Sequence, residues 1–257
     1  MSIFAIADLH LSFSTDKPMD VFGPSWESHA ARIEECWRSK IRPEDTILIP
    51  GDISWGISLD EALADLQFIE SLPGTKILSK GNHDLWWGTT KKFEDFLAAH
   101  GLTSMKILKN NGFVVENTLI AGSRGWLLPE NPESKQEDEK IYQREVGRLE
   151  RSLQDSIRMF EHMTASGNES CDGDSDDGEE AKEPLRRIAM LHYPPIYDPE
   201  HDNGFTRAME KYGVDLCLYG HLHGRAHARA FNGVRNGVEY HLVAADYLRF
   251  DPYLVQQ

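Results

Sequence analysis

Five apolar runs end directly at residues of the types that can bind metal ions, and this feature constrains the fold more than any other. The ends lie at Asp8–His10, Gly51–Asp52, Gly81–Asp84, His192 and Gly220–Gly224. A short apolar run bounded by such residues is typical of a buried strand. In α/β sheets, ligand sites form at the carboxyl ends of strands. Each of the five blocks therefore lies where a ligand site is expected.

The spacing within these blocks supports one shared site. Asp8 and His10 are two residues apart, and so are His221 and His223. In an extended backbone, alternate side chains point to the same side, so each pair is expected to aim at one region. A glycine directly precedes three of the blocks and permits tight turns and close backbone approach.

The residue types predict a centre with two metal ions. The expected ligands are Asp8, His10, Asp52, Asn82, His192, His221 and His223. This mixture of oxygen and nitrogen donors suits Mn, Fe or Zn, and also Ni or Co, better than Ca, which prefers oxygen alone. There are more ligands than one ion needs. Two ions about 3.5–4 Å apart, bridged by a carboxylate, would use them all.

Strand-like and helix-like runs alternate along the chain and predict an α/β fold with a partly antiparallel, mixed sheet. The expected strands include Ser2–Ala7, Thr46–Pro50, Lys76–Ser79, Arg187–Leu191, Val214–Tyr219, Ala226–Phe231 and Val238–Ala244. The expected helices include Trp26–Trp37, Thr90–His100 and Lys135–Met163. With no clear boundary in its 257 residues, the chain is interpreted as one domain, 1–257.

The net charge of −15 argues against sequence-independent binding to nucleic acid or an anionic membrane, which needs clustered positive charge. Much of this charge lies at 166–183, which we interpret as an acidic surface insertion. Three scattered cysteines, no basic leader and no long apolar stretch predict a cytoplasmic protein.

In order and type, these blocks resemble the motifs of the calcineurin-like metallophosphoesterase superfamily, from Asp8 to Gly224. The resemblance is nearest to small bacterial members with a His-Tyr-Pro-Pro block, here His192–Pro195. It implies a four-layer fold, with two mixed sheets packed face to face and helices outside. It also implies one divalent ion held by Asp8, His10 and His223, a second held by Asn82, His192 and His221, and Asp52 bridging both.

The same resemblance implies that His83 is an acid or a phosphate contact, oriented by Asp84. The alternatives are that His83 is a hydrogen-bond donor outside the chemistry and that Asp84 is a structural turn residue. A hydroxide shared by two metals has a lowered pKa and can attack a phosphoester at neutral pH.

The family's protein-phosphatase branch has an arginine soon after the Gly51–Asp52 position and a glutamate at the position of Asp84. This chain has neither, and it shows no added DNA-binding region. We therefore expect hydrolysis of a small phosphoester, with a phosphodiesterase favoured over a phosphomonoesterase or a nucleotide pyrophosphatase. A binding scaffold without turnover is the non-enzyme alternative. No membrane or protein partner is expected, and nucleic acid is disfavoured.

Residues near the blocks are candidates for substrate contacts. Trp55, Trp86 and Tyr193 are expected either to wall the site or to pack in the core. Arg124 follows a predicted strand and is expected either to clamp a phosphate oxygen or to form a structural salt bridge.

Overall fold

Two mixed sheets form the centre of the computed structural model, which describes residues 1–167 and 186–257. In spatial order, the first sheet contains β11 (Tyr253–Gln256), β1 (Ile3–Ala5), β2 (Thr46–Pro50), β3 (Thr75–Ser79) and β4 (Met105–Ile107). The second contains β5 (Phe113–Val115), β6 (Thr118–Ser123), β7 (Arg186–Leu191), β8 (Leu216–Tyr219), β10 (Val238–Leu242) and β9 (Gly233–Arg235).

Both sheets combine parallel strands with at least one antiparallel edge strand. In the first sheet β11 is antiparallel to β1, and the other neighbours are parallel. In the second, β5 and β9 are the antiparallel edges around four parallel strands. The predicted mixed topology is confirmed, and the carboxyl ends of neighbouring parallel strands lie together.

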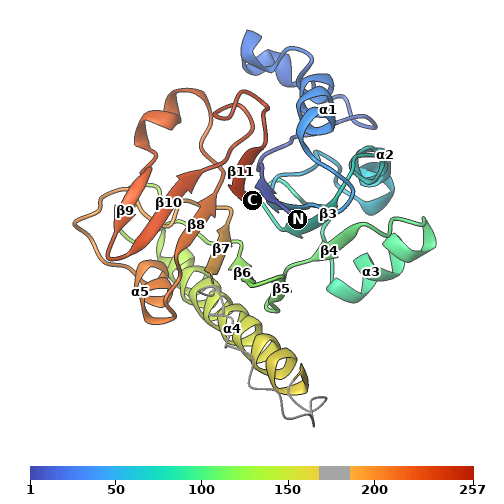
Figure 1. Ribbon diagram of the computed structural model, residues 1–257. Coiled ribbons are helices and arrows are strands. Elements are labelled where there is room, and N and C mark those ends of the chain that lie inside the picture. Colours follow the sequence, from blue (N-terminus) through green and yellow to red (C-terminus); the bar gives the residue numbers. More distant parts are fainter. Residues whose placement is uncertain (168–185) are drawn as a thin grey trace.

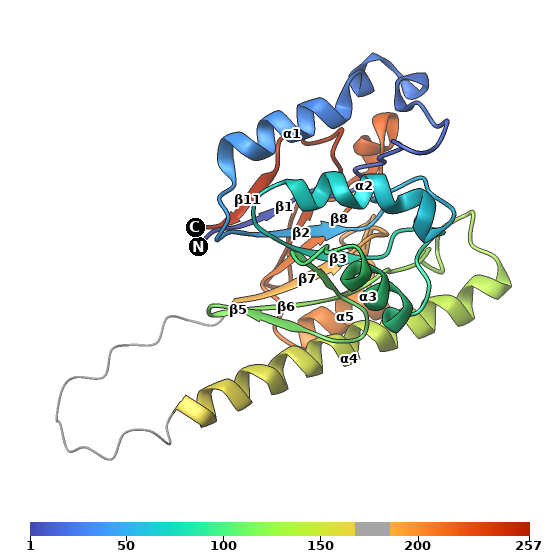
Figure 2. The ribbon, with the colours of Figure 1, turned by 90° about the vertical axis from the view of Figure 1, so that its right-hand side faces the viewer.

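Helices cover the outer faces of the sheets. The α-helices are α1 (His29–Lys40), α2 (Leu59–Ser71), α3 (Thr90–Ala99), α4 (Gln136–Gly167) and α5 (Gly204–Lys211). Short 3₁₀ turns are η1 (Met19–Phe22), η2 (Pro24–Trp26) and η3 (Gly224–Arg229). Figure 1 shows the two sheets side by side, and Figure 2 shows α1 and α2 on one outer face with α4 along the opposite side. This is the expected four-layer arrangement.

The alternation of side chains along each strand explains how these layers pack together. In β1, Phe4 packs in a core with α1 and α2, while its neighbours Ile3 and Ala5 pack in a second core between the sheets. A third core joins the other face of the second sheet to α4 and α5. Because successive strand side chains point to opposite faces, each inner strand contributes to two cores. The apolar stripe of α4 is buried there through Leu149 and Leu153.

The predicted strand at Ala226–Phe231 is wrong. That segment forms η3, in which the amides of Ala226 and Ala230 donate to the carbonyls of His223 and His227. The hairpin instead joins β9 and β10 through Asn236 and Gly237, which both have positive φ angles of 48° and 84°. Such an Asn-Gly pair is the preferred two-residue hairpin turn.

The predicted acidic insertion at 166–183 lies outside the described residues, apart from its first two positions, which end α4. Within 1–167 and 186–257, no helix is both long and apolar enough to cross a membrane.

Candidate metal centre

All seven predicted ligands converge at the carboxyl ends of strands from both sheets. Asp8 and His10 follow β1, Asp52 follows β2 and Asn82 follows β3 in the first sheet. The second sheet supplies the others: His192 after β7, and His221 and His223 after β8. The cluster is therefore assembled only when the two sheets pack against each other.

The backbone brings these side chains together through left-handed turns rather than extended strands. Asp8, His10, Asp52 and His221 have φ angles of 59°, 45°, 51° and 74°. The prediction that the paired ligands lie on extended backbone is thus wrong for Asp8, His10 and His221, although His223 is extended. Each left-handed non-glycine residue costs of order 1–3 kcal/mol, and such conformations concentrate at functional sites.

Asp8, His10 and His223 form the first ligand group. The Nε2 atoms of His10 and His223 lie 3.2 Å apart, and Nε2 of His223 is 3.4 Å from Oδ1 of Asp8. Asp8 and His10 are buried, while the His223 side chain is 30% exposed. Two ring nitrogens and a carboxylate that face one point are a donor set suited to a divalent transition metal.

Asn82, His192 and His221 form the second ligand group. Oδ1 of Asn82 lies 2.6 Å from Nε2 of His192 and 2.9 Å from Nδ1 of His221. The other nitrogen of His192, Nδ1, is 3.0 Å from the carbonyl oxygen of Pro50, which fixes the ring orientation. A backbone carbonyl in this position is a usual partner of a metal-binding histidine.

Asp52 lies between the two ligand groups. Its Oδ2 atom is 3.8 Å from Nε2 of His10 and 3.3 Å from Nε2 of His192. Burial alone raises its pKa, but the nearby His192 and His10 hold the pKa of Asp52 well below its usual range. This carboxylate therefore stays ionised and can face a cation on either side.

The pKa values of four histidines in the cluster depend on burial and on the nearby carboxylates. Burial lowers the pKa of His10 and of His221 to about 3. Burial also opposes charge on His192 and His223, but Asp52 raises the pKa of His192 to about 9, and Asp8 and Asp246 raise that of His223 to about 10. The three carboxylates of Asp8, Asp52 and Asp246 thus draw positive charge into the cluster, and two neutral rings add lone pairs. These residues fit divalent metal ions.

Two glycines leave room for the carboxylates. A Cβ atom at Gly81 would lie 2.0 Å from Oδ1 of Asp52, and one at Gly220 would lie 2.3 Å from Oδ2 of Asp8. No side chain fits at these distances. The predicted need for close backbone approach is therefore met at both positions.

The predicted role of Asp84 as the partner of the His83 ring is wrong. Its Oδ2 atom accepts from the amides of Asp52 and Gly81, and its Oδ1 atom accepts from those of Ile53 and Ser54. These bonds span 2.8–3.2 Å, and the carboxylate is fully buried. Asp84 therefore fixes the loop that presents Asp52.

His83 lies at the mouth of the cluster, half-buried against Trp55. Their ring centroids are 4.4 Å apart, and Trp55 also stacks on His10 at 5.0 Å. His83, Trp55, His10 and His223 line a cavity of about 270 Å³ with the apolar side chains of Met19, Phe22 and Trp26. Burial lowers the pKa of His83. The cavity places an apolar surface beside the candidate ligands.

The remaining predicted substrate residues take different positions. Trp86 is 4% exposed and packs against Trp87 and Phe93, so it lies in the core and not at the rim. Tyr193 is also buried, with its ring centroid 4.3 Å from that of His221. Arg124 is partly exposed and lines a second cavity beside the cluster.

One residue of this site was missed by the sequence reasoning. Oδ1 of Asp246 lies 2.9 Å from Nδ1 of His223, and Oδ2 lies 3.2 Å from Nε2 of His227 and accepts from the amide of Gly224 at 3.0 Å. This carboxylate turns the Nε2 atom of His223 toward the cluster. Asp246 follows β10, and its only sequence signal is a carboxylate just beyond a strand end.

A family model described as calcineurin-like phosphoesterase matches residues 1–225. The Gene 66 protein of Mycobacterium phage L5 is 35% identical over 78 residues, which are 30% of this chain and 37% of that protein. Among solved structures, phosphopantetheinyl hydrolase (PptH) from Mycobacterium tuberculosis has a TM-score of 0.49 and 15% identity, covering 99% of this chain and 95% of that chain. A protein of unknown function from Aquifex aeolicus, AQ665, has a TM-score of 0.48 and 15% identity, with 98% and 95% covered. The matched segment 1–225 contains all seven candidate ligands.

Proposed function

Because this chain belongs to the calcineurin-like phosphoesterase family, we propose that it hydrolyses a small phosphoester at the candidate metal centre, with a phosphodiester favoured. The position of Asp52 carries this proposal. Its carboxylate lies within 4 Å of a histidine from each ligand group, where it would bridge two ions. In this assignment, Asp8, His10 and His223 hold one ion, and Asn82, His192 and His221 hold the other.

Two bound divalent ions would supply Lewis acidity and a water molecule activated at neutral pH. The protein holds its own groups around the phosphoester. His83 lines the apolar cavity beside His10 and His223, within reach of a leaving group placed there. A phosphate next to the ring would raise the pKa of His83 and favour its protonated, donating form.

Two cavities support a diester over a monoester. The apolar cavity borders His10 and His223, whereas the second borders Lys80, directly before Gly81–Asn82, and Arg124. A phosphodiester has a substituent on each side of the phosphorus and would use both. Phosphomonoester or nucleotide pyrophosphate hydrolysis is the alternative activity. The free thiols of Cys36 and Cys217 are consistent with a cytoplasmic location, which we propose as well.

The test is a metal-reconstituted activity screen. Chelator-treated protein receives Mn, Fe, Zn, Co or Ni, and bound metal is counted by mass spectrometry. Hydrolysis of bis-para-nitrophenyl phosphate and para-nitrophenyl phosphate is then measured side by side. We expect about two ions per chain and faster hydrolysis of the diester. Preference for the monoester would shift the assignment to a phosphatase.

Variants separate the chemistry from the fold. Asp52→Asn is expected to lose metal and activity together, whereas Asp95→Asn, on the exposed face of α3, is expected to keep both. His83→Ala should keep its metal and lose about 10²–10⁴-fold in rate. Two bound ions with no hydrolysis of any phosphoester or pyrophosphate would favour a binding scaffold without turnover.

A further inference from the structure

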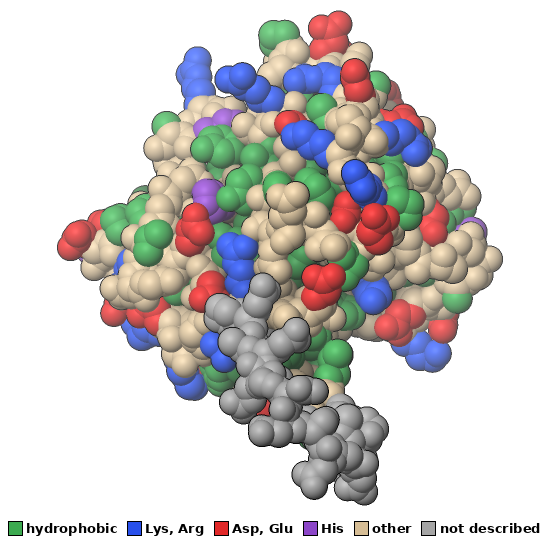
Figure 3. Space-filling model, viewed as in Figure 1, with side chains coloured by type: hydrophobic (Ala, Val, Ile, Leu, Met, Phe, Trp, Pro, Cys, Tyr) green, Lys and Arg blue, Asp and Glu red, His purple; other side chains and the backbone are tan. Residues whose placement is uncertain are grey.

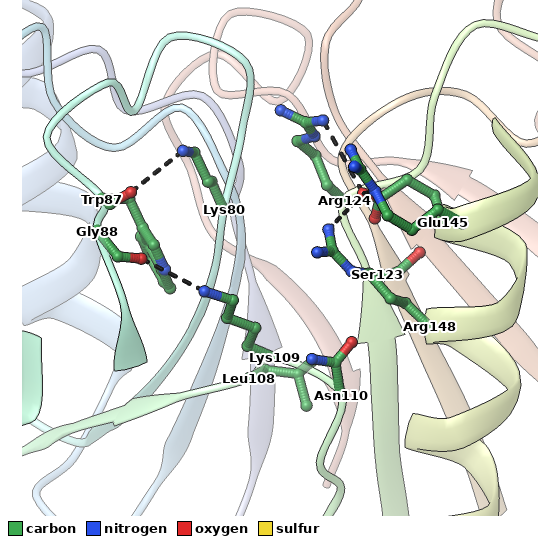
Figure 4. A pocket seen from close by; sticks show the side chains of 11 residues that line it. Lys80, Trp87, Gly88, Leu108, Lys109, Asn110, Ser123, Arg124, Glu145 and Arg148 are labelled. Carbon is green, nitrogen blue, oxygen red and sulfur yellow. Dashed lines mark hydrogen bonds and ion pairs between the residues drawn. The ribbon is translucent and has the colours of Figure 1, made fainter. Parts of the chain in front are cut away.

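Five basic side chains gather around one cavity of about 240 Å³ beside the candidate metal centre. They are Lys80, Lys109, Arg124, Arg144 and Arg148. Figure 4 shows Arg124 and Arg148 with Glu145 on one wall, facing Lys80 and Lys109 across the cavity. This concentration occurs in a chain of net charge −15. On the face drawn in Figure 3, by contrast, basic and acidic side chains are interspersed.

The cavity is built by elements that are distant in sequence. Lys80 follows β3, Lys109 follows β4, and Arg124 follows β6 of the other sheet. Arg144 and Arg148 lie one turn apart on α4. The cations therefore converge because the two sheets and α4 pack together, and no run of basic residues in the sequence produces them.

The residues that line this cavity carry little negative charge. Glu145 is the one acidic side chain among the described residues that line the cavity, and it is 1% exposed. Its Oε1 atom lies 2.6 Å from Arg148, 3.9 Å from Arg124 and 4.0 Å from Arg144. One carboxylate thus orients three guanidinium groups, and most of the positive charge is left over.

The amines of Lys80 and Lys109 and one nitrogen of Arg124 can still donate hydrogen bonds to an anion. Nζ of Lys80 donates to the carbonyl of Trp87 at 3.2 Å, and Nζ of Lys109 donates to that of Gly88 at 3.3 Å, so both have neutral partners. Nε of Arg124 is buried and has no hydrogen-bond partner among the described residues. Burial and the neighbouring Arg148 lower the pKa of Lys109. An anion in the cavity would relieve this repulsion.

The cavity adjoins the metal centre through the backbone. Lys80 directly precedes Gly81 and the candidate ligand Asn82. The carbonyl of Arg124 accepts from the amides of His192 and Tyr193, both at 3.0 Å. Lys80 and Arg124 are thus joined through the backbone to two candidate ligands, Asn82 and His192.

We propose that this cavity binds a second phosphate group of the substrate, carried by the substituent that a phosphodiester places there. Nucleoside bisphosphates and diphosphates serve as binding probes for this second phosphate. The proposal rests on the proposed function for the position of the reacting phosphoester. It adds Lys80, Lys109, Arg124 and Arg148 as residues that determine specificity, with Glu145 as a positioning residue.

The experiment compares equilibrium binding of ligands that differ by one phosphate. Isothermal titration of the metal-loaded full chain uses thymidine 3′,5′-bisphosphate against thymidine 5′-monophosphate, and ADP against AMP, to cover two phosphate spacings. We expect the additional phosphate to tighten binding by about tenfold or more in one or both pairs. This advantage should shrink to about twofold or less in Lys109→Gln and in Arg148→Gln, because each loses a charge-assisted contact.

Lys91→Gln is the matched control, since Lys91 is 84% exposed on α3 and away from the cavity lining. It should keep the full advantage. Equal affinities within both pairs, or an advantage that survives in Lys109→Gln and Arg148→Gln, would overturn the proposal. If the advantage depends on these residues but no phosphoester is hydrolysed, the proposed function fails and the anion-binding cavity stands.

Discussion

Asp52 and Asp84 hold each other's loops in place through the backbone. The Asp84 carboxylate accepts from the amide of Asp52 at 2.9 Å, and the Asp52 carboxylate accepts from the amide of His83, next to Asp84, at 2.8 Å. The loops after β2 and β3 are thereby fixed to each other. The candidate bridging ligand owes its position to a second aspartate that does not face the metal centre.

Asp84→Asn should therefore damage the metal centre without removing a ligand. Each Asp84 oxygen accepts from two amides, so either orientation of an asparagine would set its NH₂ group against two N–H donors. We expect a loss of about 2–3 kcal/mol in the free energy of unfolding and at least about tenfold weaker metal binding. Urea denaturation and metal titration measure the two effects. Unchanged values in both would mean that these bonds do not hold Asp52.

Gly220→Ala should displace Asp8. The added Cβ would lie 2.3 Å from Oδ2 of Asp8, so this candidate ligand has to move away from His10 and His223. We expect the variant to bind fewer metal ions per chain when these are counted by mass spectrometry. The control is Gly147→Ala on α4, where the nearest atom is a flexible arginine end at 3.6 Å. It should keep its metal and gain about 0.5–1 kcal/mol of stability.

Trp55 and Trp86 should respond differently to truncation. Trp86→Ala removes a core side chain packed on Trp87 and Phe93, and should cost about 3–5 kcal/mol in the free energy of unfolding. Trp55→Ala, which uncovers the rings of His10 and His83, should instead raise KM for esters with an aromatic leaving group. The opposite pattern, with a KM effect from Trp86→Ala and a large stability loss from Trp55→Ala, would indicate that Trp86 lies at the rim of the site.

Lys76 should make stability depend on pH in the alkaline range. Its amine is buried, donates to the carbonyl of Leu72 and to Oγ of Ser104, and has a pKa lowered by burial to about 8 from 10.5. Between these values the unfolded chain binds more protons than the folded chain. The contribution of Lys76 to stability therefore rises with pH across that window, and it is at its lowest below pH 8.

Denaturant unfolding of the wild type and Lys76→Met, at intervals from pH 7 to pH 10.5, tests this dependence. The wild-type free energy of unfolding minus that of the variant should increase by about 1–3 kcal/mol over the series. Lys91→Met, at an exposed site, should show a flat difference. A flat difference for Lys76→Met as well would mean that the buried amine titrates near its ordinary pKa.

Local patterns in the chain were enough to predict the α/β layers and the seven candidate ligands. An apolar run that stops at Asp8 or Asp52 marks a strand end, because a buried strand and a polar ligand need opposite residue types. The left-handed turns at Asp8 and His221 have no such signal, since aspartate and histidine are compatible with several backbone conformations. Ala226–Phe231 has a strand-like composition, but its local turn bonds make it η3.

Contacts between distant segments decided which of the predicted residues share the site. Trp86 is in the core and Trp55 is beside the cluster, although both follow a ligand block. Asp84 binds amides instead of His83, and Asp246 joins the site from beyond β10. Residue type and periodicity can be read from the sequence. Which residues line the same cavity or form a hydrogen bond depends on how the two sheets and α4 pack. That packing alone brings Lys80 of one sheet opposite Arg124 of the other.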